Sequence, residues 1–333
     1  MRACHGGNVW QSGRPADWLD FSANLNPVGP PDWARQALAA GLERARWYPD
    51  PDMAAATAGL AAHLGVDAAC VLPTDGGIGA AALAAGLAGR CAIVQPTFQE
   101  YARLCGEHRD VSWEKLSDYA PKAGERLWLC NPNNPTGAAL RRDEVLALLA
   151  RVERAGGAMV VDEAFIHYCP ERSVAGDVAD HPALVVLGSL TKALALPGIR
   201  LGYLAAHPAV IATLREQMPP WRLNCLADAV AAALPGRGAY FGEMRALNAA
   251  RRSEFAASLE DLGARVYPSE ANFLLCDFGR DMRPAIERLR QRRILARPCG
   301  RFPGLTDGHI RLAVKTEAEN AALIGALKEA LHA

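Results

Sequence analysis

The stretch that decides the fold is Ser-Leu-Thr-Lys-Ala-Leu-Ala-Leu-Pro-Gly-Ile-Arg-Leu-Gly, residues 189–202. It follows an apolar run, residues 183–187, that predicts a buried strand. It combines two hydroxyls with an arginine and with Lys192, the only lysine between Lys122 and Lys315. Open α/β sheets place their ligand sites at the carboxyl ends of strands. The stretch therefore predicts either a functional site or a solvated loop with one ordinary lysine, and the rest of the chain decides between them.

Apolar runs alternate with helical patterns on both sides of this stretch. Helices are predicted over residues 32–43 and 53–64, and strand-like runs occur at residues 70–72, 91–94, 127–130, 158–162, 183–187 and 201–205. Continuous apolar strands that alternate with helices are typical of a mostly parallel sheet covered on both faces. After Pro219-Pro220, long helical patterns and further strands indicate a smaller α+β unit. We therefore predict an α/β fold with an N-terminal segment (1–35), a large domain (36–219) and a small α+β domain (220–333).

Composition excludes several classes of protein. Half of the 333 residues are hydrophobic, and 36 basic residues balance 36 acidic ones. A nucleic-acid-binding protein would carry a basic excess. No apolar stretch reaches the roughly 18 residues of a membrane span, and the charged N-terminus does not resemble a signal peptide. The nine scattered cysteines form no CxxC pair, so we expect a reduced, cytoplasmic protein without a metal site, nucleic-acid partner or membrane contact.

Polar residues follow several of the predicted strands. Gly76 and Gly77 form a strand-to-helix turn, which suits an anion but is also common as a plain turn. Residues 131–137, Asn-Pro-Asn-Asn-Pro-Thr-Gly, place amide side chains at a loop fixed by two X-Pro steps. Asp162 ends an apolar strand, and a carboxylate buried there needs a cationic or hydrogen-bonding partner. Together with residues 189–202, these elements favour a site at one edge of the sheet.

In this order the elements resemble the fold-type-I enzymes that use pyridoxal 5′-phosphate (PLP), in particular the aspartate aminotransferase superfamily. The specific part of the resemblance is the spacing of residues 134–137 (Asn-Pro-Thr-Gly), Asp162, Ser189-x-x-Lys192 and Arg200. One departure is Phe165, which stands where many relatives carry a tyrosine. A second is the phosphate turn, which lacks the usual serine or threonine and so shifts phosphate binding to backbone N–H groups.

The resemblance implies roles for individual residues. Lys192 would bind the cofactor aldehyde covalently and move protons at the substrate carbon, and Asp162 would keep the pyridine nitrogen protonated. Asn134 would donate to the phenolic oxygen of the ring. The remaining implied cofactor contacts are Gly76, Gly77, Ser189, Thr191 and Arg200 at the phosphate, and Phe98 stacked on the ring. Tyr48 would reach the cofactor of a neighbouring subunit, which implies a homodimer with shared sites.

Within this superfamily, the segments His-Gly-Gly-Asn (5–8) and Asn-Leu-Asn-Pro (24–27) resemble those of the threonine-phosphate decarboxylases of cobalamin biosynthesis. The implied substrate is a small phosphorylated amino acid, and the implied substrate contacts are His5, Gly6, Gly7, Asn8, Asn26, Arg297 and Arg311. A histidinol-phosphate-type aminotransferase is the alternative, because one such site can cleave either bond when the substrate rotates. A PLP-fold binding protein without catalysis is a third reading, against which the intact Lys192 and Asp162 argue.

Overall fold

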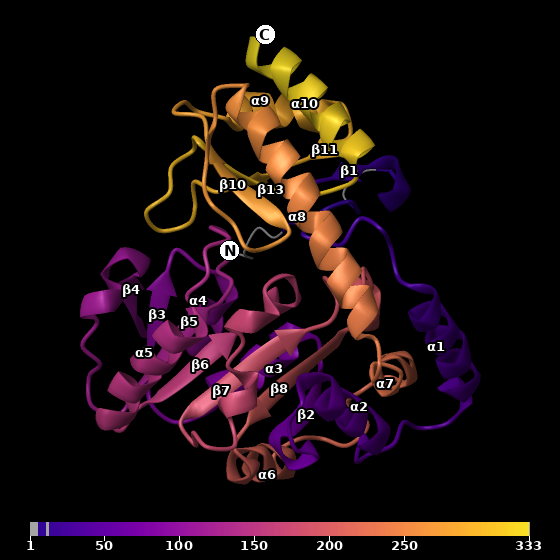
Figure 1. The fold of residues 1–333 in the computed structure, drawn as a ribbon, viewed down its shortest axis with the longest axis vertical. Helices are drawn as coiled ribbons and strands as arrows, with labels where there is room; N and C mark the ends of the chain where they lie inside the picture. Colours follow the sequence, from indigo (N-terminus) through magenta and orange to yellow (C-terminus); the bar gives the residue numbers. More distant parts are fainter. Residues whose placement is uncertain (1–5, 11–12, 333) are drawn as a thin grey trace.

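A central sheet forms the larger body of the molecule (Figure 1). The computed structural model describes residues 6–10 and 13–332, and in this part of the chain seven strands run in the order β2-β8-β7-β6-β5-β3-β4. All pairs from β7 to β4 are parallel, whereas β8 is antiparallel to both of its neighbours. The strands are β2 (Val71–Asp75), β3 (Arg90–Gln95), β4 (His108–Ser112), β5 (Glu125–Cys130), β6 (Ala158–Asp162), β7 (Leu184–Ser189) and β8 (Leu201–Ala206). This confirms the predicted α/β fold.

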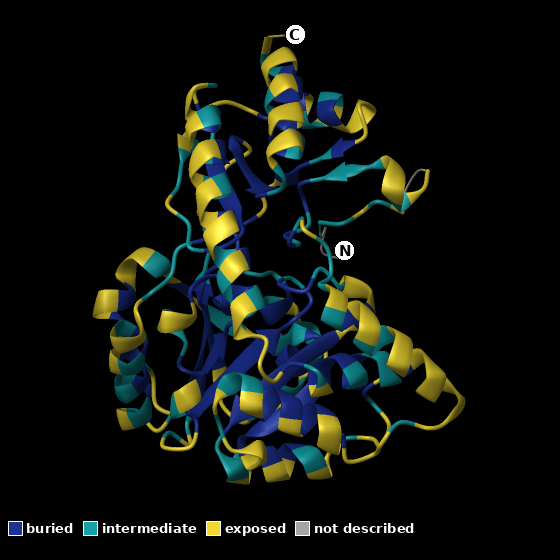
Figure 2. Cartoon of the chain, turned by 45° about the vertical axis from the view of Figure 1, so that its right-hand side comes forward, coloured by how far each residue is buried: buried dark blue, intermediate teal, exposed yellow. Residues whose placement is uncertain are grey.

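Helices surround this sheet, and their exposed faces point outward while the strands are buried between them (Figure 2). Every residue of β5, β7 and β8 is buried, as expected for strands covered on both faces. The helices of the larger body are α1 (Asp32–Glu43), α2 (Ala54–Leu64), α3 (Gly77–Ala85), α4 (Glu100–Cys105), α5 (Arg142–Arg154), α6 (Pro208–Glu216) and α7 (Cys225–Ala232). Because α3 and α4 follow β2 and β3 directly, their first residues lie at the carboxyl edge of the sheet.

The smaller body is an antiparallel sheet covered by helices. Its strands run in the order β12-β13-β10-β9, with β9 (Arg265–Val266), β10 (Phe273–Asp277), β12 (Arg297–Pro298) and β13 (His309–Ala313). Helices α9 (Arg283–Gln291) and α10 (Glu317–His332) lie beside it, and the long α8 (Gly238–Glu260) runs into it from the larger body (Figure 1). The N-terminal strand β1 (Leu19–Asp20) pairs with β11 (Ile294–Leu295). The first segment of the chain is therefore attached to the last third.

The two bodies have separate hydrophobic cores, and the first of these cores includes residues beyond 219. The larger cluster includes buried residues from Leu223 to Met244. Helix α7 packs on α1 and α2, and the first turns of α8 contribute Phe241 and Met244 to the same core. From Phe255 onward most buried hydrophobic residues belong to the second cluster, although Ala271 and Phe273 pack in the first. The boundary predicted at residue 219, at the Pro219-Pro220 break that follows α6, stays a prediction. We propose that the division falls within α8.

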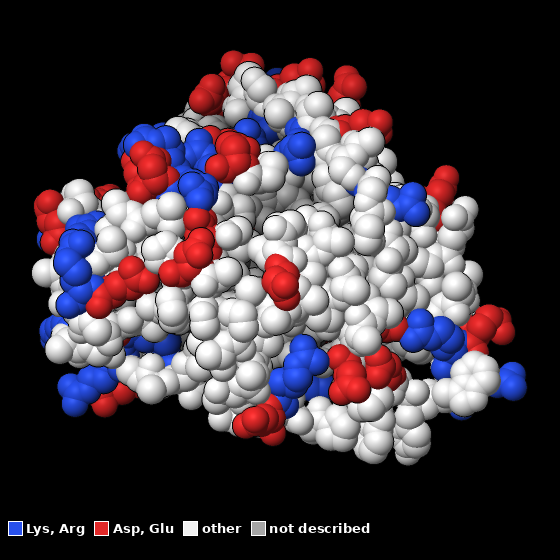
Figure 3. Space-filling view, turned by 60° about the horizontal axis from the view of Figure 1, so that its bottom comes forward, with Lys and Arg blue, Asp and Glu red and all other residues white. Residues whose placement is uncertain are grey.

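The surface carries charges of both signs. On the face shown in Figure 3, Lys and Arg alternate with Asp and Glu around a broad area of uncharged atoms. Within the described residues, no helix is long and apolar enough to cross a membrane, and no group of three or more His, Cys, Asp or Glu side chains is placed to hold a metal ion. The cysteines that the structure describes are free thiols.

Candidate active site

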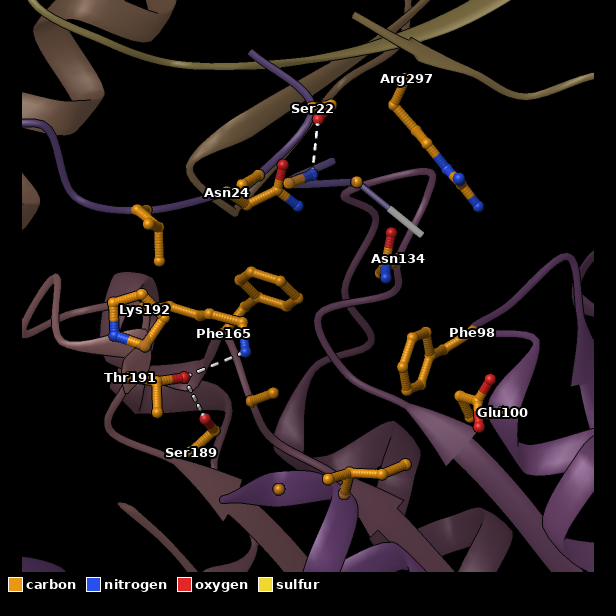
Figure 4. A pocket seen from close by; sticks show the side chains of 18 of the residues that line it. Ser22, Asn24, Phe98, Glu100, Asn134, Phe165, Ser189, Thr191, Lys192 and Arg297 are labelled. Atoms are coloured by element: carbon orange, nitrogen blue, oxygen red, sulfur yellow. Dashed lines mark hydrogen bonds between the residues drawn. The ribbon is translucent and has the colours of Figure 1, made fainter. Parts of the chain in front are cut away.

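A cavity of about 840 Å³ lies where the carboxyl edge of the large sheet meets the smaller body. Its walls include the last residue of β6 (Asp162), the last residue of β7 (Ser189), and Arg311 of β13. Lys192, on the loop after β7, projects into it, with Phe98 on the opposite side and Asn134 and Arg297 above (Figure 4). Residues far apart in the sequence meet here because parallel strands end at one edge.

Lys192 is held by hydroxyl groups at the end of β7 and on the loop that follows it. Its Nζ donates to Thr191 Oγ1 at 3.2 Å, and that hydroxyl lies 2.8 Å from Ser189 Oγ. Burial lowers the pKa of the Lys192 amine from 10.5 to about 8, and the positive charge of Arg311 acts in the same direction. Asp162 opposes the shift. A lysine with this pKa is partly unprotonated near neutral pH and can act as a nucleophile.

Asp162 is fixed from two sides. The hydroxyl of Tyr101 donates to its Oδ2, and the Ala164 N–H donates to its Oδ1 at 2.8 Å. Burial raises the pKa of the Asp162 carboxyl, while these donors and the charge of Lys192 act against that shift. The sequence analysis did not identify Tyr101, although its spacing of three residues from Phe98 could have placed both on one face of a helical turn. Phe98 and Tyr101 both line the cavity.

The turn between β2 and α3 requires glycine. Gly76 has a φ of 81°, and a Cβ there would lie 2.7 Å from Nη2 of Arg200. A Cβ on Gly202 of β8 would lie 2.4 Å from the carbonyl carbon of Gly76 and 2.7 Å from the nitrogen of Gly77. Arg200 is itself in the left-handed region at φ 58° and donates to the Asp75 carbonyl oxygen at 3.4 Å. The packing thus brings a guanidinium to the N-terminus of α3, where N–H groups lack helical partners.

Arg311 is a buried cation that no described carboxylate pairs. Its Nη1 donates to Asn134 Oδ1, its Nη2 donates to the Ser22 carbonyl oxygen at 2.6 Å, and its Nε is buried without a hydrogen-bond partner. Burial lowers its pKa to about 10. Arg297 lies directly opposite it across β12 and β13 and also lines the cavity. Two arginines of neighbouring strands therefore face this space, which favours an anionic ligand.

The N-terminal residues divide into those at the cavity and those away from it. Gly6 and Gly7 line it, and the Gly7 N–H donates to Ser22 Oγ at 2.8 Å. Gly6 packs so closely that a Cβ would lie 2.1 Å from the Ser22 carbonyl oxygen. Asn8 is exposed and is not among the lining residues. His5 lies outside the described residues, so its predicted substrate contact stays a prediction.

The structure places Asn24, and not Asn26, at the cavity. The Asn26 amide donates to the Ala193 carbonyl oxygen at 3.1 Å and to Tyr240 Oη at 3.0 Å, and the Asn26 N–H donates to the Lys192 carbonyl oxygen at 3.0 Å. Asn26 therefore holds the lysine loop and does not line the cavity, and its predicted contact with a substrate stays a prediction. Asn24 lines the cavity, and its Oδ1 is buried without a hydrogen-bond partner in the described structure.

Two aromatic residues differ in where they lie. Phe165 lines the cavity, with its ring 6.0 Å from Lys192 Nζ and edge-on to Phe273 at 5.0 Å. Tyr48 is 82% exposed, does not line the cavity, and packs on Trp221 at 5.0 Å. Within one chain the structure does not bring Tyr48 to the other predicted residues. Its contact with a neighbouring subunit stays a prediction.

Comparisons with known proteins agree with this geometry. A threonine-phosphate decarboxylase from Salmonella typhimurium is 34% identical over 99% of this chain and 97% of its own. A histidinol-phosphate aminotransferase from Symbiobacterium thermophilum is 31% identical over 95% and 91%. The crystal structure of L-threonine-O-3-phosphate decarboxylase from Porphyromonas gingivalis superposes with a TM-score of 0.84 at 27% identity, over 94% of this chain and 99% of that one. Residues 16–327 match the family "Aminotransferase class I and II". The chain therefore belongs to the class I and II aminotransferase family.

Proposed function

We propose that the protein is a PLP enzyme that decarboxylates L-threonine O-3-phosphate to (R)-1-amino-2-propanol O-2-phosphate, a step of cobalamin biosynthesis. The observation that carries this proposal is the convergence of Lys192, Asp162, Arg297 and Arg311 on one cavity. The similarity along nearly the whole chain to a threonine-phosphate decarboxylase supports it.

The polar groups of the cavity fit this cofactor. Lys192 Nζ, with its lowered pKa, would hold the cofactor aldehyde covalently. Asp162, fixed by Tyr101, would contact the pyridine nitrogen. Asn134 accepts from Arg311 through Oδ1, so its Nδ2 would donate to the phenolic oxygen. When bound, the cofactor supplies a ring that takes up the electron pair left by the departing carboxyl group.

The other end of the cavity offers donors for a phosphate. The Gly76 N–H donates to the Thr74 carbonyl oxygen at 2.8 Å, so Gly77, the first residue of α3, is the predicted glycine whose backbone N–H would reach a phosphate in the cavity. Ser189, Thr191 and Arg200 line the same region and would complete the phosphate site. Phe98 would stack on the ring from the side opposite Lys192 (Figure 4). Because Phe165 has no hydroxyl, Asn134 would be the principal side-chain donor to the phenolic oxygen.

The paired arginines match a substrate with two anionic groups. Threonine phosphate carries a carboxylate and a phosphate on neighbouring carbons, and Arg297 and Arg311 are direct neighbours across β12 and β13. We assign Arg311, whose guanidinium is held by Asn134 and by a backbone carbonyl, to the carboxylate. We assign Arg297 to the phosphate, with Gly6, Gly7 and Asn24 beside it. Bidentate recognition of both groups would fix the substrate orientation.

That orientation determines which bond breaks. The bond from Cα to the carboxyl carbon breaks, carbon dioxide leaves, and a proton is added at Cα in its place. Lys192 Nζ would hold and deliver that proton, and Thr191 Oγ1 orients the amine for it. Residues 22–25 and the arginines of the smaller body line the cavity and would limit the access of water to the site.

Carbon dioxide release tests the proposal directly. We expect the protein, supplied with PLP and threonine phosphate but no keto acid, to release one carbon dioxide for each amino alcohol phosphate formed. Lys192→Ala should lose both this release and the visible absorption of the bound cofactor, while its circular dichroism spectrum stays unchanged. Serine phosphate lacks one methyl group, so we expect it to be used roughly 10- to 200-fold less efficiently.

A histidinol-phosphate aminotransferase is the second candidate, because such an enzyme matches 95% of this chain at 31% identity. Histidinol phosphate carries a phosphate but no carboxylate, so it offers one anionic group to Arg297 and Arg311, whereas threonine phosphate offers two. Turnover of histidinol phosphate that requires 2-oxoglutarate, with no carbon dioxide from threonine phosphate, would establish this alternative and reject the decarboxylase.

We also propose that the protein is a homodimer with shared sites. Trp47, Tyr48 and Trp221 are large side chains exposed at 61%, 82% and 50%, and exposed aromatic groups of this kind are typical of interfaces. Sedimentation analysis should give twice the chain mass. Tyr48→Ala should weaken cofactor retention, whereas a monomeric, fully active protein would contradict the shared site.

A further inference from the structure

Asp20 places a carboxylate on the wall of the cavity that also carries Arg297 and Arg311. It is the last residue of β1 and is partly exposed. Burial lowers the pKa of Arg311, and the negative charge of Asp20 acts against that shift. A carboxylate also repels the anionic ligand that the two arginines favour. The position of Asp20 therefore calls for an explanation other than contact with that ligand.

One oxygen of Asp20 closes a turn over residues 20–23. Its Oδ1 accepts hydrogen bonds from the Ser22 N–H at 2.8 Å, from the Ser22 hydroxyl at 2.6 Å and from the Ala23 N–H at 3.2 Å. Asp side chains stabilise short turns in this way, by accepting from backbone N–H groups further along the chain. Because the three donors converge on one oxygen, the Asp20 side chain determines where the backbone and the hydroxyl of Ser22 lie.

Ser22 connects this turn to two groups at the cavity. Its carbonyl oxygen accepts from Arg311 Nη2 at 2.6 Å. Its hydroxyl, which donates to Asp20, accepts in turn from the Gly7 N–H at 2.8 Å. A Cβ on Gly6 would lie 2.1 Å from the same carbonyl oxygen, so the chain has little room to shift there. A single turn thus holds both the Arg311 guanidinium and the Gly6-Gly7 segment.

The backbone around the turn is attached to the smaller body. Strand β1 pairs with β11, and the Phe21 N–H donates to the Leu295 carbonyl oxygen at 2.8 Å. The Ala313 N–H, at the end of the strand that carries Arg311, donates to the Phe21 carbonyl oxygen at 2.9 Å. None of these bonds involves the Asp20 side chain. A substitution of Asp20 can therefore change the turn while these backbone contacts stay in place.

We propose that Asp20 is a positioning residue for the anionic substrate, which acts through the turn at residues 20–23 and does not touch the ligand. Its carboxylate fixes Ser22, and Ser22 fixes the Arg311 guanidinium and the Gly7 backbone. The inference rests on the proposed function, because it takes Arg311 as the group that binds the substrate carboxylate. The role requires the hydrogen-bond acceptor of Asp20 and not its negative charge, so two substitutions of this residue have different expected outcomes.

Binding of an unreactive ligand tests this role without catalysis. The probe is 3-phosphooxybutanoate, which is threonine phosphate without its amino group, titrated into the holoenzyme by calorimetry. We expect Asp20→Ala to weaken its binding about tenfold, because Arg311 loses the orientation that charge-assisted hydrogen bonds require. Asp20→Asn keeps an oxygen that accepts the three bonds and removes a repelling charge, so it should bind at least as tightly as the wild-type protein. Asp67→Ala, which removes an exposed carboxylate from a similar turn away from the cavity, should change nothing.

Equal affinities of the two Asp20 variants, whether raised, lowered or unchanged, would show that the acceptor has no role and would overturn the proposal. Absence of binding to the wild-type holoenzyme would overturn it as well, together with the assignment of Arg311. If circular dichroism shows that Asp20→Ala does not fold, Ser22→Ala decides, because it removes only the hydroxyl. Binding weakened about threefold supports the role, and unchanged binding rejects it.

Carbon dioxide release by the wild-type protein reports separately on the proposed function. If threonine phosphate yields no carbon dioxide while the Asp20 variants bind the probe as expected, the decarboxylase is rejected and the positioning role of Asp20 is retained. If carbon dioxide is released but the two variants bind the probe equally, the reaction stands and the positioning role is rejected.

Discussion

At the scale of single residues, Arg311 is the group whose surroundings most restrict what the cavity can bind. Its guanidinium is buried, held by Asn134 and the Ser22 carbonyl oxygen, and has a buried Nε without a partner. Arg311→Lys keeps the charge but loses the planar fork. We expect kcat/KM for threonine phosphate to fall about 10- to 100-fold, since hydrogen bonds to charged groups contribute about 1.5–3 kcal/mol. The exposed Arg301→Lys is the control, and an unchanged kcat/KM in Arg311→Lys would remove this residue from substrate binding.

Tyr101 is a positioning residue for Asp162, and its hydroxyl can be removed without changing the ring. Tyr101→Phe takes away a donor to the charged carboxylate, so the pKa of Asp162 should rise further. We expect kcat to fall about tenfold and the acid limb of its pH profile to move to higher pH. Tyr119→Phe is a matched control, because its hydroxyl donates to the Glu125 carboxylate at 2.7 Å away from the cavity. An unshifted pH profile in Tyr101→Phe would show that Tyr101 contributes only to packing.

At the scale of elements, the close packing of β8 against the β2–α3 turn forms the proposed phosphate site. Gly202 pairs with Thr74 across β8 and β2, and a Cβ there would overlap the backbone of Gly76 and Gly77. We expect Gly202→Ala to lower the free energy of unfolding by about 1–3 kcal/mol and to weaken cofactor retention, measured by denaturant titration and by visible absorbance after gel filtration. Gly176→Ala, where the Cβ has open space, should change neither quantity.

Elements with a strong apolar pattern could be predicted from the sequence, and polar or very short ones could not. The helix over residues 32–43 is α1, and the apolar runs are the central strands of the sheet. Strand β4, His-Arg-Asp-Val-Ser, is the edge strand of the sheet, and most of its residues are only partly buried or exposed. It therefore lacks the apolar run from which a strand can be predicted. In the site, Lys192, Asp162 and Asn134 stand at or just after strand ends and match the spacing that carries the family resemblance, so the sequence could point to them. Asn24 was not, since sequence spacing does not say which way a loop side chain points.

At the scale of the whole molecule, the half-buried His63 and the buried His167 lie where the larger body meets the helix that leads into the smaller one. His63 of α2 and His167 approach through their Nε2 atoms at 3.1 Å, and both pack on Phe241 of α8. Burial lowers the pKa of His63 from 6.5 to about 4 and that of His167 to about 3. Above pH 6.5 both are neutral in the folded and the unfolded chain. Below pH 6.5, these histidines bind protons in the unfolded chain but stay neutral in the folded chain. The free energy of unfolding therefore falls as the pH falls.

We therefore expect the free energy of unfolding to decrease by about 3 kcal/mol or more between pH 6.5 and pH 4, the interval set by the pKa values of His63. His167→Phe keeps an aromatic ring against Phe241 and removes one of the two titrating groups, so its decrease over the same interval should be smaller than that of the wild-type protein. Denaturant unfolding at a series of pH values measures both. His332→Gln, at the exposed end of α10, should follow the wild-type curve. If the free energy of unfolding of His167→Phe depends on pH as strongly as that of the wild-type protein, His167 does not contribute to the loss of stability. Its protonation would then leave the packing of residues 166–168 against α2 and α8 intact.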